Sequence, residues 1–69
     1  MKLSARNTLK GTVSDVILGP VSAEVVLSIA PGMEIVAVIS TSSAKALKLK
    51  KGKRAYAVVK ASSVMIAID

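Results

Sequence analysis

The sequence predicts an all-β protein with one short helix, and two patterns carry this prediction. Apolar and polar residues alternate with a period of two over much of the chain, as in strands, whose successive side chains point to opposite faces. Val and Ile are abundant and Tyr56 is the one aromatic residue, a composition that favours strands with small side chains. Turn-forming pairs at Gly19-Pro20, Pro31-Gly32 and Lys51-Gly52 divide the chain. We therefore expect short strands joined by turns.

These breaks place the strands in order along the chain. The first apolar run ends at Gly19, and the segment 21–29 follows as a second strand with its apolar residues at the odd positions. The segment 33–40, MEIVAVIS, is apolar on both faces, so we expect the core to cover one face and a neighbouring chain the other. A fourth strand is expected over 54–60, and a fifth over 64–68, VMIAI.

One segment breaks the alternation. TSSAKALKL, at 41–49, offers hydroxyl N-cap candidates at 41–43, then Ala44 and Leu47 at helical spacing, then lysines. We expect a helix of about two turns. Three strands, a helix and two further strands is the order of an OB-fold-like five-stranded barrel with one short helix between strands three and four. Residues 1–69 are expected to form this single domain.

The size and composition of the chain point to self-association. A chain of 69 residues buries only about 60% of the surface that its unfolded form exposes. The chain has no Cys for disulfides, yet 52% of its residues are hydrophobic, so we expect partner copies to cover the excess apolar surface. No signal peptide or membrane-spanning segment is recognisable, which favours a cytoplasmic protein that does not contact a membrane.

Catalysis is not expected. The chain has no Cys and no His, and its four acidic residues are scattered, so neither a nucleophile with its base nor a pair of carboxylates can be assigned. We predict no catalytic residue, no direct metal ligand and no organic cofactor.

Binding functions remain, and the net charge of +6 favours anionic ligands. A basic OB-type module for single-stranded nucleic acid is one alternative, with Tyr56 to stack a base and the basic run at 48–54 to contact phosphates. That run also fits a solvated loop, and one aromatic residue is few for such a module. Another alternative is an oligomeric scaffold that binds no ligand.

Small oxyanions are the third possibility. A fully deprotonated anion offers only acceptors, so its site needs donors and excludes carboxylates. Three stretches have this character: Ser4 with Arg6, the hydroxyl residues at 40–43, and Lys60 with the residues up to Ser63.

Three segments of the chain resemble a known family. SARNTLKGTV at 4–13, AEVVLSIA at 23–30 and VKASSVMIA at 59–67 are similar to the molbindins, the small Mop-type molybdate-binding proteins, and the similarity covers essentially the whole chain. The resemblance implies a single Mop domain with an OB-like barrel that assembles as a homohexamer, a trimer of dimers. It also implies that molybdate or tungstate is bound between subunits for storage or buffering.

The resemblance also assigns residues to the oxyanion. It implies that Arg6 and Lys60 reach the anion from different subunits. A second kind of site, built from backbone N–H groups near a symmetry axis, would fall at Gly19, Val21 and Ser22. The full set of residues implied for the first site is Ser4, Arg6, Ser40, Ser43, Lys60 and the backbone of Ala61.

Overall fold

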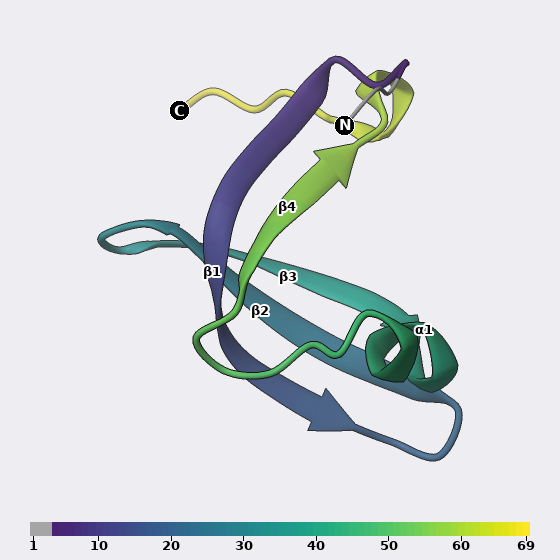
Figure 1. The fold of residues 1–69 in the computed structure, drawn as a ribbon. Helices are drawn as coiled ribbons and strands as arrows, with labels where there is room; N and C mark the ends of the chain where they lie inside the picture. Colours follow the sequence, from purple (N-terminus) through teal and green to yellow (C-terminus); the bar gives the residue numbers. More distant parts are fainter. Residues whose placement is uncertain (1–3) are drawn as a thin grey trace.

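The computed structural model describes residues 4–69, and its strands form one curled antiparallel sheet in the order β3-β2-β1-β4 (Figure 1). The prediction of an all-β fold with a short helix between the third and fourth strands is confirmed. The elements are β1 (Asn7–Leu18), β2 (Ser22–Ala30), β3 (Met33–Ser40), α1 (Thr41–Ala46), β4 (Arg54–Val59) and a 3-10 turn, η1 (Ala61–Ser63).

The long strand β1 joins two parts of the sheet. Its residues 7–12 pair with β4, and its residues 12–18 pair with β2, so Thr12 is shared by both ladders. Just before Thr12, a Cβ added to Gly11 would lie 2.5 Å from the Ser28 carbonyl oxygen and 3.0 Å from Leu27 Cγ. The absence of a side chain at Gly11 therefore lets β1 and β2 approach closely where the sheet curls.

The core follows the alternation read from the sequence. The odd positions Ala23, Val25 and Leu27 of β2 are buried, and Val13 of β1 packs with the last two in the central cluster. The second apolar face predicted for β3 is uncovered in the single chain, where Val36 and Val38 are 56% and 72% exposed. A neighbouring chain on that face stays a prediction.

The fifth strand predicted over 64–68 is wrong for the single chain. Among residues 4–69, none after Val59 belongs to the sheet, so β3 and β4 are its two free edges and the described part of the chain does not close into a barrel. The tail after η1 runs away from α1, toward the opposite side of the molecule (Figure 1). The alternation of apolar residues predicts which segments can form strands. It does not predict whether a segment pairs with the sheet, because pairing requires a free edge strand within reach.

The helix α1 begins one residue earlier than expected and is shorter. Its N-cap is Ser40, whose Oγ accepts from the Ser43 N–H at 3.1 Å. It ends in a Schellman motif: the Leu49 N–H donates to the Ala44 carbonyl at 3.1 Å, and the Lys48 N–H to the Lys45 carbonyl at 3.0 Å. Lys48 takes the left-handed conformation of this motif, with φ of +53°.

We expect Lys48→Gly to raise the free energy of unfolding by about 1 kcal/mol, because a left-handed backbone is strained for a residue with a Cβ. Urea denaturation at fixed protein concentration measures the change. Lys50→Gly is the matched control, since it removes the same charge from the same loop without a positive φ to relieve. An equal change in both variants would contradict the prediction.

Candidate functional site

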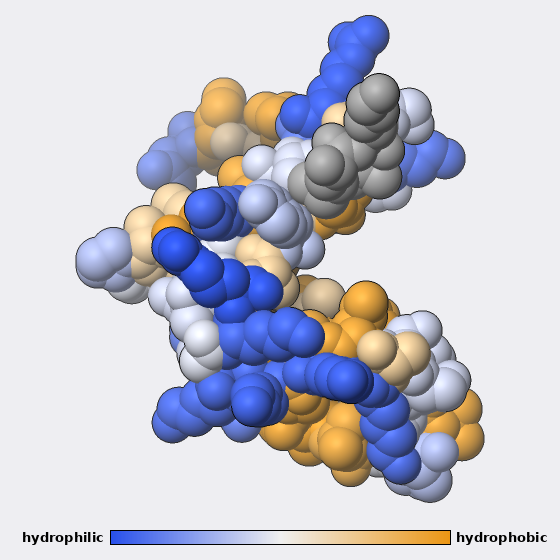
Figure 2. Space-filling model, in the orientation of Figure 1, coloured by the Kyte–Doolittle hydropathy of each residue, from blue (hydrophilic) through white to orange (hydrophobic). Residues whose placement is uncertain are grey.

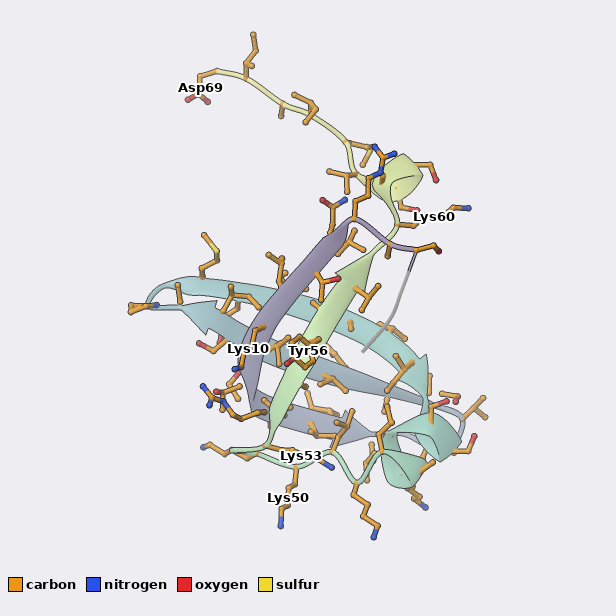
Figure 3. The ribbon with its side chains drawn as sticks, turned by 45° about the horizontal axis from the view of Figure 1, so that its top comes forward. Lys10, Lys50, Lys53, Tyr56, Lys60 and Asp69 are labelled. Atoms are coloured by element: carbon orange, nitrogen blue, oxygen red, sulfur yellow. The ribbon has the colours of Figure 1, made fainter. Side chains whose placement is uncertain are left out.

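The pairing of β1 with β4 brings two distant cations to one end of the sheet. Asn7, the first residue of β1, pairs with Val59, the last residue of β4. Arg6 and Lys60 stand just outside this pair, and both line one open hollow together with Ser4. Figure 3 shows Lys60 at this end of β4, beside η1. The remaining lining residues are Ala5, Val58, Ala61 and Ser62.

The chemistry of this hollow, which we call the Arg6–Lys60 hollow, suits an anion. It contains a guanidinium, an ammonium and the hydroxyls of Ser4 and Ser62, and none of the described residues lining it is acidic. The first hydrogen bond of η1 is donated by the Ser63 N–H to the Lys60 carbonyl, so the N–H groups of Ala61 and Ser62 before it have no carbonyl partner within the turn and add further donors. Such a set of donors matches a ligand that can only accept hydrogen bonds.

The structure brings together Ser4, Arg6, Lys60 and Ala61 of the predicted site, all from one chain. The antiparallel β1–β4 ladder explains why they are neighbours within one chain, because it places the residue before Asn7 next to the residue after Val59. The contact between Arg6 and Lys60 of different subunits, which the family resemblance implies, stays a prediction. Ser62 was missing from the predicted set, although the acid-free segment 60–63 pointed to it.

Ser40 and Ser43 lie elsewhere in the chain. They belong to the N-terminus of α1, and Ser40 pairs with Ser22, beyond the end of β1 opposite to Arg6 (Figure 1). The Ser40 hydroxyl donates to the Ser43 Oγ at 2.7 Å. Within one chain, the two hydroxyls therefore cap the helix and do not reach the Arg6–Lys60 hollow.

The second-site candidates lie in the turn between β1 and β2. The Gly19 N–H donates to the Ser22 carbonyl at 2.9 Å, so this donor is used inside the turn. The turn is also tied to α1, because the Thr41 N–H donates to the Val21 carbonyl and the Thr41 hydroxyl to the Gly19 carbonyl. A small hollow beside it is lined by Pro20, Val21, Thr41, Ser42 and Lys45. Ser42 and Lys45 were not predicted, although their spacing places them on one face of a helix.

Across residues 4–69, no three His, Cys, Asp or Glu residues come together as in a metal site. Tyr56 is half exposed in the middle of β4, opposite Lys10 of β1 (Figure 3). In the basic run, the Lys53 ammonium donates to the Leu47 carbonyl at the end of α1. No helix in the described part of the chain is long and apolar enough to cross a membrane.

Comparison with known proteins identifies the family. The TOBE domain model matches residues 3–66. The chain belongs to the TOBE domain family. It is 44% identical, over all 69 residues of both chains, to the "Probable molybdenum-pterin-binding protein" of Haemophilus influenzae. It is 50% identical over 66 residues to Molybdenum-pterin-binding protein 2 of Clostridium pasteurianum, covering 96% of this chain and 97% of that protein.

Longer relatives contain the same unit. The chain is 44% identical to the Molybdenum transport protein ModE of Herbaspirillum seropedicae over 69 residues, which is 26% of that protein's length. This TOBE-domain chain therefore matches some relatives along their whole length and others over about a quarter of it.

Solved structures agree with the fold. MopII of Clostridium pasteurianum superposes with a TM-score of 0.91 at 48% identity, over 97% of this chain and all of that one. The structure described as the cytoplasmic molybdate-binding protein ModG, with molybdate bound, gives a TM-score of 0.83 at 49% identity. That match covers 88% of this chain and 43% of the ModG chain. The relatives and structures named here give no support to the nucleic-acid alternative.

Proposed function

We propose that this TOBE-domain protein is a single Mop domain that binds molybdate or tungstate in the cytoplasm, to store or buffer the anion without transforming it. The observation that carries this proposal is the Arg6–Lys60 hollow, where every polar side chain among the described lining residues can donate a hydrogen bond and none carries a carboxylate. The relatives at 44% and 50% identity are named for molybdenum-pterin binding, and ModG for molybdate binding in the cytoplasm. This naming supports a molybdenum oxyanion as the ligand.

The chemistry of the hollow fits a tetrahedral dianion. The planar guanidinium of Arg6 can donate two parallel hydrogen bonds to two oxygens of the anion, whereas the Lys60 ammonium provides a compact charge for a third. Molybdate and tungstate have the same charge and shape, so one set of donors serves both. Without an anion, the positive charges of Arg6 and Lys60 repel each other in the same hollow.

The proposed site is completed by a second chain. Ser40 and Ser43 are too far along the sheet to join Arg6 and Lys60 of their own chain, so they would contribute from a neighbour. We place this contact within a homohexamer arranged as a trimer of dimers. If only the assembled form binds the anion, a ligand concentration of 100 Kd stabilises the assembly by about 2.7 kcal/mol per site.

Native mass spectrometry of the purified protein tests the proposal, with molybdate added and sulfate as the matched tetrahedral control. We expect a hexamer that gains several molybdates and few sulfates. A protein that takes up neither anion would overturn the proposed function. Uptake that falls steeply as chloride is raised would indicate diffuse charge attraction, which nucleic-acid binding shows and a specific oxyanion site does not.

Ser40 permits a substitution that separates helix capping from anion binding. Asp is as good an N-cap residue as Ser, so Ser40→Asp should leave the stability of α1 nearly unchanged. Its carboxylate would repel a dianion, and we expect molybdate affinity to fall by more than about tenfold, since 1.4 kcal/mol of repulsion suffices for that. Isothermal titration calorimetry measures the affinity, and Ser40→Thr, which keeps a neutral hydroxyl, is the control. Normal molybdate binding by Ser40→Asp would remove Ser40 from the site.

A further inference from the structure

The two strands β1 and β4 expose one side of their ladder to solvent. Ala55 and Ala57 of β4 pack against the core cluster, so the alternate residues of β4 lie on the other side of the sheet. Their partners in β1 share that side. We call this exposed surface the Tyr56 face, and it consists of three cross-strand pairs: Thr8 with Val58, Lys10 with Tyr56, and Thr12 with Arg54.

The Tyr56 face has the composition of a protein-binding surface. Tyr56 and Val58 form its apolar centre and are 51% and 47% exposed. Two cations flank Tyr56, because Lys10 stands opposite in β1 and Arg54 lies two residues away in β4 (Figure 3). Tyr and Arg are among the residue types that contribute most to binding at protein interfaces.

Charge is divided unevenly over this side of the sheet. None of the six residues of the Tyr56 face is acidic, whereas Asp15, Glu24 and Glu34 lie on the same side of the part formed by β1, β2 and β3. The loop that leads into β4 adds lysines, and Figure 2 shows hydrophilic side chains gathered over it. An acidic ligand is therefore attracted to the Tyr56 face and repelled by the neighbouring part of the sheet.

Hydrogen bonds fix the start of β4 within the single chain. The Val13 N–H donates to the Lys53 carbonyl at 2.8 Å, and the Gly52 N–H donates to the Val13 carbonyl at 2.8 Å. Arg54 and Tyr56 are thus carried by an ordered backbone. A partner that binds them does not have to order this segment, which lowers the entropic cost of binding.

The Tyr56 face is continuous with the Arg6–Lys60 hollow. Val58 belongs to the Tyr56 face and also lines that hollow. A partner seated on Val58 therefore stands at the edge of the proposed anion site. If the partner carries carboxylates, they would repel a dianion in the hollow.

We propose that the Tyr56 face docks an acidic protein segment, whose apolar side chain covers Tyr56 and Val58 and whose carboxylates pair with Lys10 and Arg54. Docking brings negative charge to the edge of the hollow, so the partner and molybdate each weaken the binding of the other. A partner of this kind would favour release of the stored anion. The docking is independent of the proposed function, whereas its opposition to molybdate rests on that function.

The observations favour a protein over single-stranded nucleic acid as the partner. Nucleic-acid strands bind to several aromatic side chains, on which successive bases stack. The chain has one aromatic residue, Tyr56. Its neighbour on the face, Val58, offers an apolar contact that an apolar side chain of a protein can use.

Fluorescence anisotropy at physiological ionic strength tests the docking. The probe is a labelled synthetic peptide with a leucine between two runs of glutamate, and the control peptide has serine in place of the leucine. We expect Tyr56→Thr to weaken binding of the leucine peptide by roughly tenfold, the effect of losing an aromatic hot-spot residue. The variant should also bind the two peptides equally, because the contact with the leucine is lost. Thr suits an exposed strand position, and circular dichroism checks the fold.

Charge variants separate a specific contact from diffuse attraction. Lys10→Gln should weaken binding of the leucine peptide severalfold. Lys50→Gln removes the same charge from the loop before β4, outside the Tyr56 face, and should have little effect (Figure 3). Equal losses in the two variants would overturn the proposal, since net charge alone would then explain the binding.

Two other occupants of the face give different results, and either would overturn the proposal. Tighter binding of a labelled oligothymidylate than of the leucine peptide, lost in Tyr56→Thr, would assign the face to nucleic acid. A smaller oligomer of Tyr56→Thr in native mass spectrometry would show that a second copy of the chain covers the face.

The opposition to molybdate is measured with the same peptide. Saturating molybdate should weaken binding of the leucine peptide severalfold, and sulfate at the same ionic strength should not. If native mass spectrometry shows molybdate bound but the peptide affinity is unchanged, the opposition is wrong. A protein that takes up no molybdate, yet binds the peptide through Tyr56, would lose the proposed function and keep the docking face.

Discussion

Gly11→Ala is expected to lower the free energy of unfolding by about 1–3 kcal/mol, the usual cost of forcing extra atoms into a closely packed position. The new Cβ would lie 2.5 Å from the Ser28 carbonyl oxygen, which is backbone of β2 and cannot rotate away as a side chain can. Relief requires β1 and β2 to separate beside Thr12, the residue that pairs with both β2 and β4. Urea denaturation at fixed protein concentration measures the effect.

Gly32→Asn is the control for this prediction. Gly32 lies in the β2–β3 turn with φ of +74° and has no atom within 4 Å of an added Cβ. Asn tolerates the left-handed conformation, so we expect only a slight change in stability. A small effect at both glycines would show that β1 and β2 do not need their close approach at Gly11.

Much of the fold could be predicted from local patterns. The alternation in 21–29 gives the buried residues Ala23, Val25 and Leu27 directly, because the period of two fixes which side chains share a face. The close approach of β1 and β2 at Gly11 could not be predicted, since nothing in LKGTV distinguishes a glycine required by close packing from one that is merely tolerated. The same limit applies to the tail: VMIAI has the composition of a strand, but pairing is a property of edges that only the assembled sheet defines.

The candidate site could also be predicted only in part from the sequence. Donor chemistry without acids identified the segments around Arg6 and Lys60, although 53 residues separate them, and the β1–β4 register explains how they meet. Ser40 and Ser43 were predicted for the same site from the family resemblance. In the single chain, they form the N-cap of α1. Spacing along the sequence could not reveal this separation, because it depends on which end of the curled sheet each strand terminus reaches.

Arg6→Ala is expected to weaken molybdate binding by roughly 10- to 100-fold, because hydrogen bonds to charged groups contribute about 1.5–3 kcal/mol each and 1.4 kcal/mol is tenfold in affinity. The fold should remain intact, since Arg6 is exposed and precedes the first residue of β1. Isothermal titration calorimetry gives the affinity, and circular dichroism with urea denaturation checks the fold.

Two further variants separate the role of the guanidinium from that of net charge. Lys10→Ala removes the same charge from an exposed position in β1 that does not line the Arg6–Lys60 hollow, so its molybdate affinity should stay close to that of the unmodified protein. Arg6→Lys keeps the charge but loses the planar pair of donors, so its affinity should fall between those of Arg6→Ala and the unmodified protein. If Lys10→Ala weakened binding as much as Arg6→Ala, the anion would be attracted by the overall positive charge, and the assignment of a specific site to Arg6 and Lys60 would be wrong. If instead only the Arg6 variants weakened binding, the donors of the hollow would account for the affinity, because net charge is equal in the two alanine variants.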